Sequence, residues 1–242
     1  MNRLRVVLIA MVLFPYCAWA WGPSTHAHIA SCVTEGQNLS VLFGSMLPDC
    51  SAVIRDNSAE AYQFNRLTHR EFDLLEKSAL KTGFKTHNGI WGADYYAHLI
   101  YSPDPEEIYS VVKIRQLMQE FDITTSQAED VFEMCVDIQM RLFYGPSWGA
   151  LMEQAANASG AEHEQIMVDT YAAELADRVD GLTLGEAEED IRNAVRGYKS
   201  LTITMGEQLQ LSEAEIHEVI PPLLALYLDC DVDMAEVYYT RG

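Results

Sequence analysis

Apolar residues recur at spacings of three and four along almost the whole chain, a pattern typical of helices with one buried face. No segment shows the strict apolar–polar alternation, bounded by Asn-Gly or Asp-Gly turns, that strands would require. The pattern therefore predicts a single all-α domain of about nine helices. The helical segments that it predicts span residues 24–33, 39–47, 68–80, 87–101, 106–121, 126–143, 147–156, 162–179 and 184–208, with a last helix after 212.

Capping residues and prolines set several of these boundaries. Thr68 is followed three residues later by Glu71, the spacing of a capping box, so we expect a helix to begin there. Pro48 stops the 39–47 helix, and the proline pair 221–222 predicts a kink in the last one.

The first twenty residues have the three parts of a secretion signal. Arg3 and Arg5 precede an apolar run at 6–14, and residues 18–20 form a small-x-small cleavage site. We expect cleavage after Ala20, which leaves a domain of residues 21–242 in the periplasm or outside the cell. No later apolar run reaches the roughly 20 residues that span a bilayer.

The chain is strongly acidic. Its formal net charge is −20, and removal of the two leader arginines would bring it to −22. Such a surface repels nucleic acid and anionic lipid, so nucleic acid is a disfavoured partner. A zwitterionic lipid, bound peripherally, or a metal-screened phosphate remains compatible with this charge.

Four cysteines follow the leader: Cys32, Cys50, Cys135 and Cys230. In an oxidising compartment they could form two disulfides with three possible connectivities, and proximity in the sequence is the only reason to pair Cys32 with Cys50. None lies in a CxxC pair, which disfavours a zinc site made of thiolates.

Trp21 would be the first residue after cleavage, and this position has chemical consequences. Its free amino group and carbonyl oxygen could chelate a metal ion, and His26 lies close enough in sequence to reach the same ion.

Five of the seven histidines fall within the first 98 residues, and each has another ligand type nearby. On the predicted 87–101 helix, His87, Trp91, Asp94 and His98 share one face. Asp94 and His98 could bind one ion, or Asp94 could simply orient the His98 imidazole. We keep both interpretations open.

Asp49 and His69 complete the candidate set. Asp49 follows Pro48 in a turn that would point its carboxylate into the core, and His69 lies in the first turn of its predicted helix. Helix bundles build metal sites from such inward-facing side chains. Nitrogen and oxygen ligands suit zinc, with one to three ions, and Asp49 could bridge ions or accept a proton from water.

Four stretches together resemble the zinc-dependent phospholipase C family, which includes the amino-terminal domain of glycosylphosphatidylinositol-specific phospholipase D. The single-strand-specific zinc nucleases share that fold. The stretches are Trp21-Gly22 with Ser24-Thr25-His26 and Ile29, then residues 43–50 around Pro48-Asp49, then Thr68-His69, and then residues 96–100 around His98.

The resemblance implies an all-α fold with a zinc cluster in a cleft between helices, and hydrolysis of a phosphodiester. By residue, it implies that Trp21 and His26 hold one ion and that Asp49, His69 and His98 hold another. Asp49 would be the catalytic base.

Two departures from the family pattern matter. The family places an aspartate four residues after the helical histidine, where this chain has Ser102, so that Asp94 or Asp104 would have to substitute. The further histidines and glutamate of the bacterial enzymes are also missing, and Glu133 and Asp137, four apart on one predicted helix, are candidates to replace them.

Three hypotheses follow. The first is a secreted zinc phosphodiesterase acting on a phospholipid or related phosphate ester. The second is a catalytically degenerate metal-binding or interaction domain of the same fold. The third is a zinc nuclease, which the acidic surface disfavours.

Overall fold

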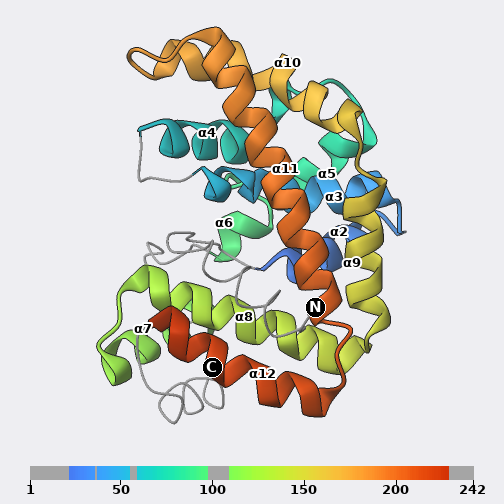
Figure 1. The fold of residues 1–242 in the computed structure, drawn as a ribbon, viewed down its shortest axis with the longest axis vertical. Coiled ribbons are helices and arrows are strands. Elements are labelled where there is room, and N and C mark those ends of the chain that lie inside the picture. Colours follow the sequence, from blue (N-terminus) through green and yellow to red (C-terminus); the bar gives the residue numbers. More distant parts are fainter. Residues whose placement is uncertain (1–21, 36, 55–58, 98–108, 229–242) are drawn as a thin grey trace.

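The computed structural model describes residues 22–35, 37–54, 59–97 and 109–228. Within these ranges every regular element is a helix, with eleven α-helices and two 3₁₀ helices and no strand (Figure 1). The all-α prediction is confirmed, although the described part alone holds more α-helices than the nine expected. Trp21, His98, Ser102, Asp104 and Cys230 lie outside it, as does the predicted signal peptide.

The elements follow one another in the order α2 (Pro23–Val33), α3 (Leu39–Met46), η1 (Leu47–Val53), α4 (Ala59–Arg70), η2 (Phe72–Leu74), α5 (Ala79–His87), α6 (Ala93–Ala97), α7 (Tyr109–Phe121), α8 (Thr125–Tyr144), α9 (Ser147–Ala158), α10 (Ala161–Arg178), α11 (Leu184–Gln208) and α12 (Glu213–Leu228). Among the described helices, none combines the length and apolar character that crossing a bilayer requires.

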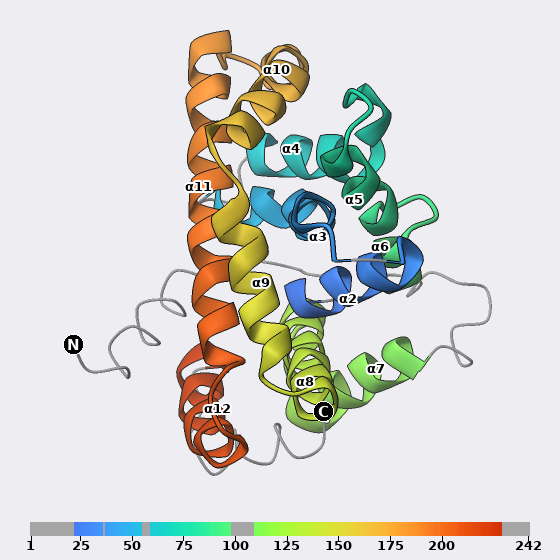
Figure 2. The ribbon, with the colours of Figure 1, turned by 90° about the vertical axis from the view of Figure 1, so that its right-hand side faces the viewer.

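Two hydrophobic cores hold these helices together. The larger is built from α2, α3, α4, α5, α9, α10 and α11, and its fully buried side chains include Phe43, Phe64, Tyr171 and Tyr198. The smaller lies between α7, α8 and α12, around Ile114, Leu117, Val131 and Phe132. In two perpendicular views the α7, α8 and α12 layer lies below the main bundle, with α2 between them (Figures 1 and 2). Helix α2 packs into the larger core through Ala27 and Ala30 and is hydrogen-bonded to Asp137 of α8, so it connects the two parts.

Helices α3 and α5 approach backbone to backbone, which positions the end of α5. A Cβ atom at Gly44 would lie 2.5 Å from the Leu80 carbonyl oxygen, and one at Gly83 would lie 2.5 Å from Ser45 N. Only glycine permits such an approach. As a result, the last residue of α5, His87, comes to lie against Ser45 of α3.

The predicted 68–80 helix is wrong. Thr68 lies in the last turn of α4, where its hydroxyl donates to the Pro48 carbonyl at 2.8 Å instead of capping a new helix. The residue that caps the following helix, α5, is Ser78, whose Oγ accepts a hydrogen bond from Lys81 N. The helix α4 itself was not predicted from its own amphipathic pattern.

The predicted 87–101 helix is also interrupted. Asn88 ends α5, and its side-chain oxygen accepts hydrogen bonds from the backbone N–H groups of Ile90 and Trp91. This turn competes with helix continuation, so that the chain reverses before α6 begins at Ala93. Trp91 does not share a buried face with His87 and is 54% exposed.

Cys32, Cys50 and Cys135 are free thiols, so the expected Cys32–Cys50 disulfide is not formed. Cys32 is exposed near the end of α2 whereas Cys50 is buried in η1, so the two side chains do not share an environment.

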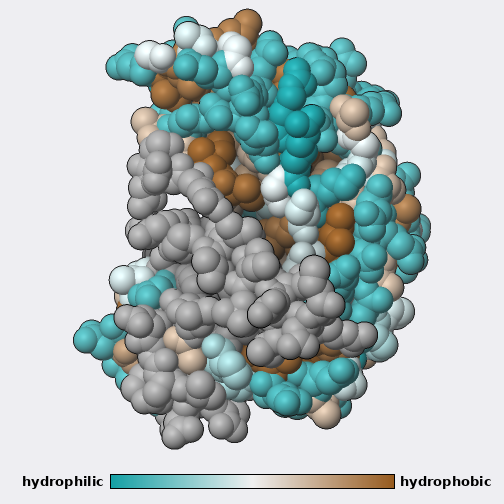
Figure 3. Space-filling model, viewed as in Figure 1, coloured by the Kyte–Doolittle hydropathy of each residue, from teal (hydrophilic) through white to brown (hydrophobic). Residues whose placement is uncertain are grey.

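Most of the described surface in the view of Figure 3 is hydrophilic, in keeping with the acidic composition.

Candidate metal centre

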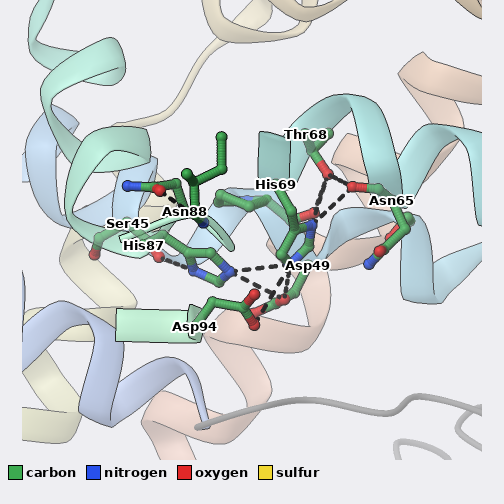
Figure 4. A network of polar contacts seen from close by, with 11 residues as sticks. Ser45, Asp49, Asn65, Thr68, His69, His87, Asn88 and Asp94 are labelled. Carbon is green, nitrogen blue, oxygen red and sulfur yellow. Dashed lines mark hydrogen bonds and ion pairs between the residues drawn. The ribbon is translucent and has the colours of Figure 1, made fainter. Parts of the chain in front are cut away.

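Three side chains from three separate helices meet in the interior at hydrogen-bonding distances. His69 Nε2 lies 3.2 Å from Asp49 Oδ1 and 3.1 Å from His87 Nε2, and His87 Nε2 lies 3.5 Å from the same Asp49 oxygen (Figure 4). The three atoms form a nearly equilateral triangle. Zinc bonds of about 2.0–2.1 Å at tetrahedral angles would separate neighbouring N and O ligands by about 3.3 Å. The triangle therefore has the size of one face of a zinc coordination tetrahedron.

The opposite nitrogens of both imidazoles are held by backbone carbonyls. His69 Nδ1 lies 2.9 Å from the Asn65 carbonyl oxygen, and His87 Nδ1 lies 2.8 Å from that of Ser45. A carbonyl oxygen only accepts, so each Nδ1 carries the proton and donates it. When the imidazole is neutral, its Nε2 lone pair then faces Asp49. A hydrogen bond from the far ring nitrogen to a carbonyl is the arrangement that orients a histidine as a metal ligand.

Local sequence explains how Asp49 and His69 come together. Pro48 lies in the first turn of η1, directly before Asp49. The hydrogen bond from the Thr68 hydroxyl to the Pro48 carbonyl ties η1 to the end of α4. The neighbours of these two residues, Asp49 and His69, are thereby brought face to face.

Two more residues join the cluster from α2 and α6. The His26 ring stacks on the His87 ring with centroids 3.9 Å apart, and Asp94 Oδ1 lies 3.9 Å from His69 Nε2. The Asp94 carboxylate fits because a Cβ at Gly89 would lie 2.8 Å from its Oδ2. Two overlapping groups result, and in each the potential ligand atoms all lie within 4.8 Å of one another. They are His26, Asp49 and His87, and His69, His87 and Asp94. All five side chains are buried.

Burial and charge drive the two central histidines in opposite directions. Burial would lower the pKa of His69, but Asp94 and Asp49 together outweigh it and raise that pKa to about 9. Burial, together with His26 and His69, holds the pKa of His87 well below its usual value. Without a metal, His69 is thus the cation that balances the carboxylates at neutral pH. A metal ion could take over that role.

The two carboxylates predicted as late ligands, Glu133 and Asp137, lie on one buried face of α8 together with Glu129, which was not predicted. Glu129, Glu133 and Asp137 follow one another at intervals of four residues, and each is less than a tenth exposed. This is an unusual concentration of acid in the interior, since buried carboxylates require partners.

Asp137 binds the first turn of α2. Its carboxylate accepts hydrogen bonds from Ser24 N at 3.1 Å, Thr25 N at 3.0 Å and Thr25 Oγ1 at 2.8 Å. A Cβ at Gly22 would collide with it. Burial raises the pKa of Asp137 to about 6, although the Thr25 and Ser24 hydrogen bonds pull it down. Asp137 therefore takes the place of an N-cap side chain for α2. One of the residues that it binds, Thr25, directly precedes His26.

Four of the six predicted metal ligands, His26, Asp49, His69 and Asp94, are brought together in the cluster. The other two, Trp21 and His98, lie outside the described residues. His69 reaches the site from the last turn of its helix rather than from the first turn.

The predicted ligand set omitted His87, which lies at the centre of the cluster. The Asn88-Gly89 sequence that follows His87 is a turn signal, and it could have shown that this histidine ends one helix rather than beginning another.

Comparison with known proteins gives no relative to set beside this geometry. No family model matches the chain, and neither curated proteins nor solved structures gave a significant match.

Proposed function

We propose that the chain is a secreted zinc-dependent phosphodiesterase that hydrolyses a phospholipid or related phosphate ester. The single observation that carries the proposal is the triangle of His69 Nε2, His87 Nε2 and Asp49 Oδ1. Its donor set is nitrogen and oxygen, which suits zinc. A backbone carbonyl holds the Nδ1–H of each imidazole, so Nε2 is left for the metal, which would displace the second proton of His69.

Asp94 supports the proposal further. The zinc-dependent phospholipases that the sequence resembles carry an aspartate where this chain has Ser102. In the structure, Asp94 brings a carboxylate to the same cluster from α6, at 3.9 Å from His69 Nε2. A carboxylate of the required type is therefore present even though its sequence position differs.

The residues divide the proposed chemistry as follows. His26, Asp49, His69, His87 and Asp94 would hold zinc. Bound zinc would neutralise charge on phosphoryl oxygens and would lower the pKa of water to about 7. Asp49, whose Oδ1 lies within 3.5 Å of both His69 Nε2 and His87 Nε2, would accept the proton of the attacking water. The water oxygen would add to phosphorus while the bond from phosphorus to the alcohol oxygen breaks, and the proton taken by Asp49 would pass to the departing alcohol oxygen. The products are an alcohol and a phosphomonoester.

The test compares metal content and turnover in the same preparation. Protein from the periplasm or medium would be stripped with a chelator, reloaded with zinc and assayed for release of phosphorylated headgroup from phosphatidylcholine vesicles. Activity should vanish on stripping and return with zinc. His69→Ala should abolish it, whereas His217→Ala, on an exposed side chain of α12, should leave it unchanged.

Each alternative predicts a different result. Zinc bound without turnover of any phosphate ester would favour the catalytically degenerate domain. Cleavage of single-stranded DNA in place of lipid would favour the nuclease. Turnover that survives complete removal of metal would refute the proposed function.

A further inference from the structure

A second group of ligand-type side chains lies on the exposed side of α2. His28 and Cys32 are four residues apart, so they lie on one face of the helix. His28 Nε2 lies 3.5 Å from Cys32 Sγ and 3.3 Å from the hydroxyl of Tyr144, the last residue of α8. Cys32 and Tyr144 are exposed, and His28 is half-buried. None of these three side chains belongs to the buried cluster.

Two aromatic rings hold the His28 imidazole in place. The Tyr144 ring lies at a centroid distance of 4.6 Å, and the Trp148 ring meets the imidazole edge-on at 5.4 Å. Trp148 is itself anchored, because its indole N–H donates to the Ser24 carbonyl at 3.3 Å. The orientation of Nε2 is therefore set by packing, and a ligand that binds there need not first order the ring.

A single nitrogen faces two partners in this cluster. A neutral imidazole Nε2 has either one lone pair or one proton, so it can form a good hydrogen bond with only one of Cys32 and Tyr144 at a time. A cation bound at Nε2 in place of a proton accepts further ligands, so both neighbours of this nitrogen become candidate ligands.

The distances suit such a cation. Zinc bonds of about 2.3 Å to sulfur and about 2.0 Å to nitrogen or oxygen, at tetrahedral angles, place N and S about 3.5 Å apart and N and O about 3.3 Å apart. The observed separations are 3.5 Å and 3.3 Å.

We propose that Cys32, His28 and Tyr144 form a surface site for a thiolate-preferring divalent cation of the zinc class. Cys32 binds as the thiolate, His28 through Nε2 and Tyr144 through its oxygen, with water in the fourth position. The absence of a CxxC motif does not exclude such a site, because a Cys–His pair four apart on a helix supplies the same kinds of ligand.

The ligand chemistry of the two sites separates them experimentally. The buried cluster offers only nitrogen and oxygen, whereas the surface site includes sulfur. Cobalt(II) bound by a thiolate gives a near-ultraviolet sulfur-to-metal charge-transfer band, and cobalt bound by imidazole and carboxylate does not. Titration of the reduced full-length mature chain with cobalt(II) alone therefore reports on the surface site.

The expected result is a charge-transfer band that saturates with one equivalent of cobalt beyond those taken up by the buried cluster. Cys32→Ser should remove the band. His28→Ala should lower the affinity about 100-fold, and Tyr144→Phe should lower it about tenfold. Cys230→Ser, which removes a different thiol, and His69→Ala, which disables only the buried cluster, should both keep the band.

Alkylation gives a second readout that does not depend on cobalt. One equivalent of zinc beyond the buried cluster should slow modification of Cys32 by iodoacetamide at least about tenfold, measured on the Cys32 peptide by mass spectrometry. In His28→Ala the protection should be lost.

Several outcomes would overturn the site. They are no charge-transfer band in the wild type, a band that remains in Cys32→Ser, or an affinity that neither His28→Ala nor Tyr144→Phe changes. This test does not measure activity on phosphate esters, so its result is independent of whether the protein is an enzyme.

Discussion

Helix α2 carries two histidines only two residues apart, and they lie in contrasting surroundings. His26 is 1% exposed and stacks on His87, whereas His28 is half-buried and lies beside the exposed Cys32 and Tyr144. The first belongs to a cluster whose members change one another's pKa values, and the second to a cluster in contact with solvent. Neither cluster exists in the unfolded chain, so we expect metal binding to be coupled to folding at both. The coupling should be stronger in the buried cluster, whose ligands come from five separate elements.

Removal of metal from the buried cluster should give the largest effect, a fall in the Tm of the protein. A ligand present at about 1,000 times its Kd stabilises the native state by about 4 kcal/mol. For a chain of this size that corresponds to a fall in Tm of about 10 °C on chelation. Differential scanning calorimetry of the zinc-loaded and stripped protein measures it.

The Cys32→Ser variant serves as the control for this comparison. Most of the fall in Tm on chelation should remain in this variant, since the surface site has fewer ligands and contributes the smaller part of the stabilisation. A fall in Tm that disappears in Cys32→Ser would reverse the assignment of the two clusters.

Truncation of one histidine in each cluster should lower the free energy of unfolding far more in the buried cluster than in the surface cluster. His87→Ala removes a fully buried ring and leaves the Ser45 carbonyl without its donor, which should lower the free energy of unfolding of the metal-free protein by about 3 kcal/mol. His28→Ala should cost about 1 kcal/mol or less. Urea unfolding of chelated samples gives both values.

His217→Ala is the control for removal of a histidine side chain from an exposed part of α12. Its free energy of unfolding should stay within about 0.5 kcal/mol of that of the wild type. Equal losses in His87→Ala and His28→Ala would contradict the contrast.

The pH dependence of the metal-free protein should come from the buried cluster. The pKa of His69 is about 9 in the folded protein, against about 6.5 in an unfolded chain, so the folded state binds that proton more tightly. The resulting stabilisation, about 3 kcal/mol at most, is fully present below pH 6.5 and is lost as the pH rises through 9. The free energy of unfolding, measured in steps across this window, should fall.

Two further samples check the origin of this slope. His69→Gln should flatten it, and zinc-loaded protein should show less of it because the metal replaces the proton. A free energy of unfolding that rises from pH 6.5 to 9 would show that His69 is not the group responsible.

A smaller effect than those of metal removal and of His87→Ala concerns the support that α8 gives to α2. Asp137→Asn keeps one oxygen acceptor but loses the charge that receives three hydrogen bonds, which should cost about 2 kcal/mol. Because these bonds hold the turn that precedes His26, zinc affinity of the buried cluster should fall about tenfold. Isothermal titration with zinc measures it.

The surface site provides the internal reference, since His28 and Cys32 lie beyond this first turn. Cobalt affinity of the thiolate site should therefore be unchanged in Asp137→Asn. A parallel loss at both sites would mean that the substitution had disordered the whole of α2.

The sequence predicted the longer helices best, because their amphipathic pattern and their caps agree. The predicted 126–143 and 184–208 segments match α8 (Thr125–Tyr144) and α11 (Leu184–Gln208) closely. Thr124 and Thr183 begin these helices with capping boxes that are formed in the structure.

The site was predicted in its residue types but not in its geometry. Asp49, His69 and Asp94 were identified, yet the helices that were expected to carry His69 and Asp94 begin and end elsewhere. The hydroxyl of Thr68 has a tertiary partner twenty residues away, and local spacing cannot distinguish that role from a helix cap. The binding of Asp137 to Ser24 and Thr25 is likewise invisible in a periodic pattern.

The hydrogen bonds between α2 and Asp137 also have a consequence for biosynthesis. They join residues 112 and 113 positions apart, so α2 leaves the ribosome long before the carboxylate that caps it. At about 5–20 residues per second, the first turn of α2 waits on the order of ten seconds for its partner. The support of His26 is thus added late in synthesis, after all five residues of the buried cluster have been made. A ribosome stalled before α8 should leave the first turn of α2 without its cap.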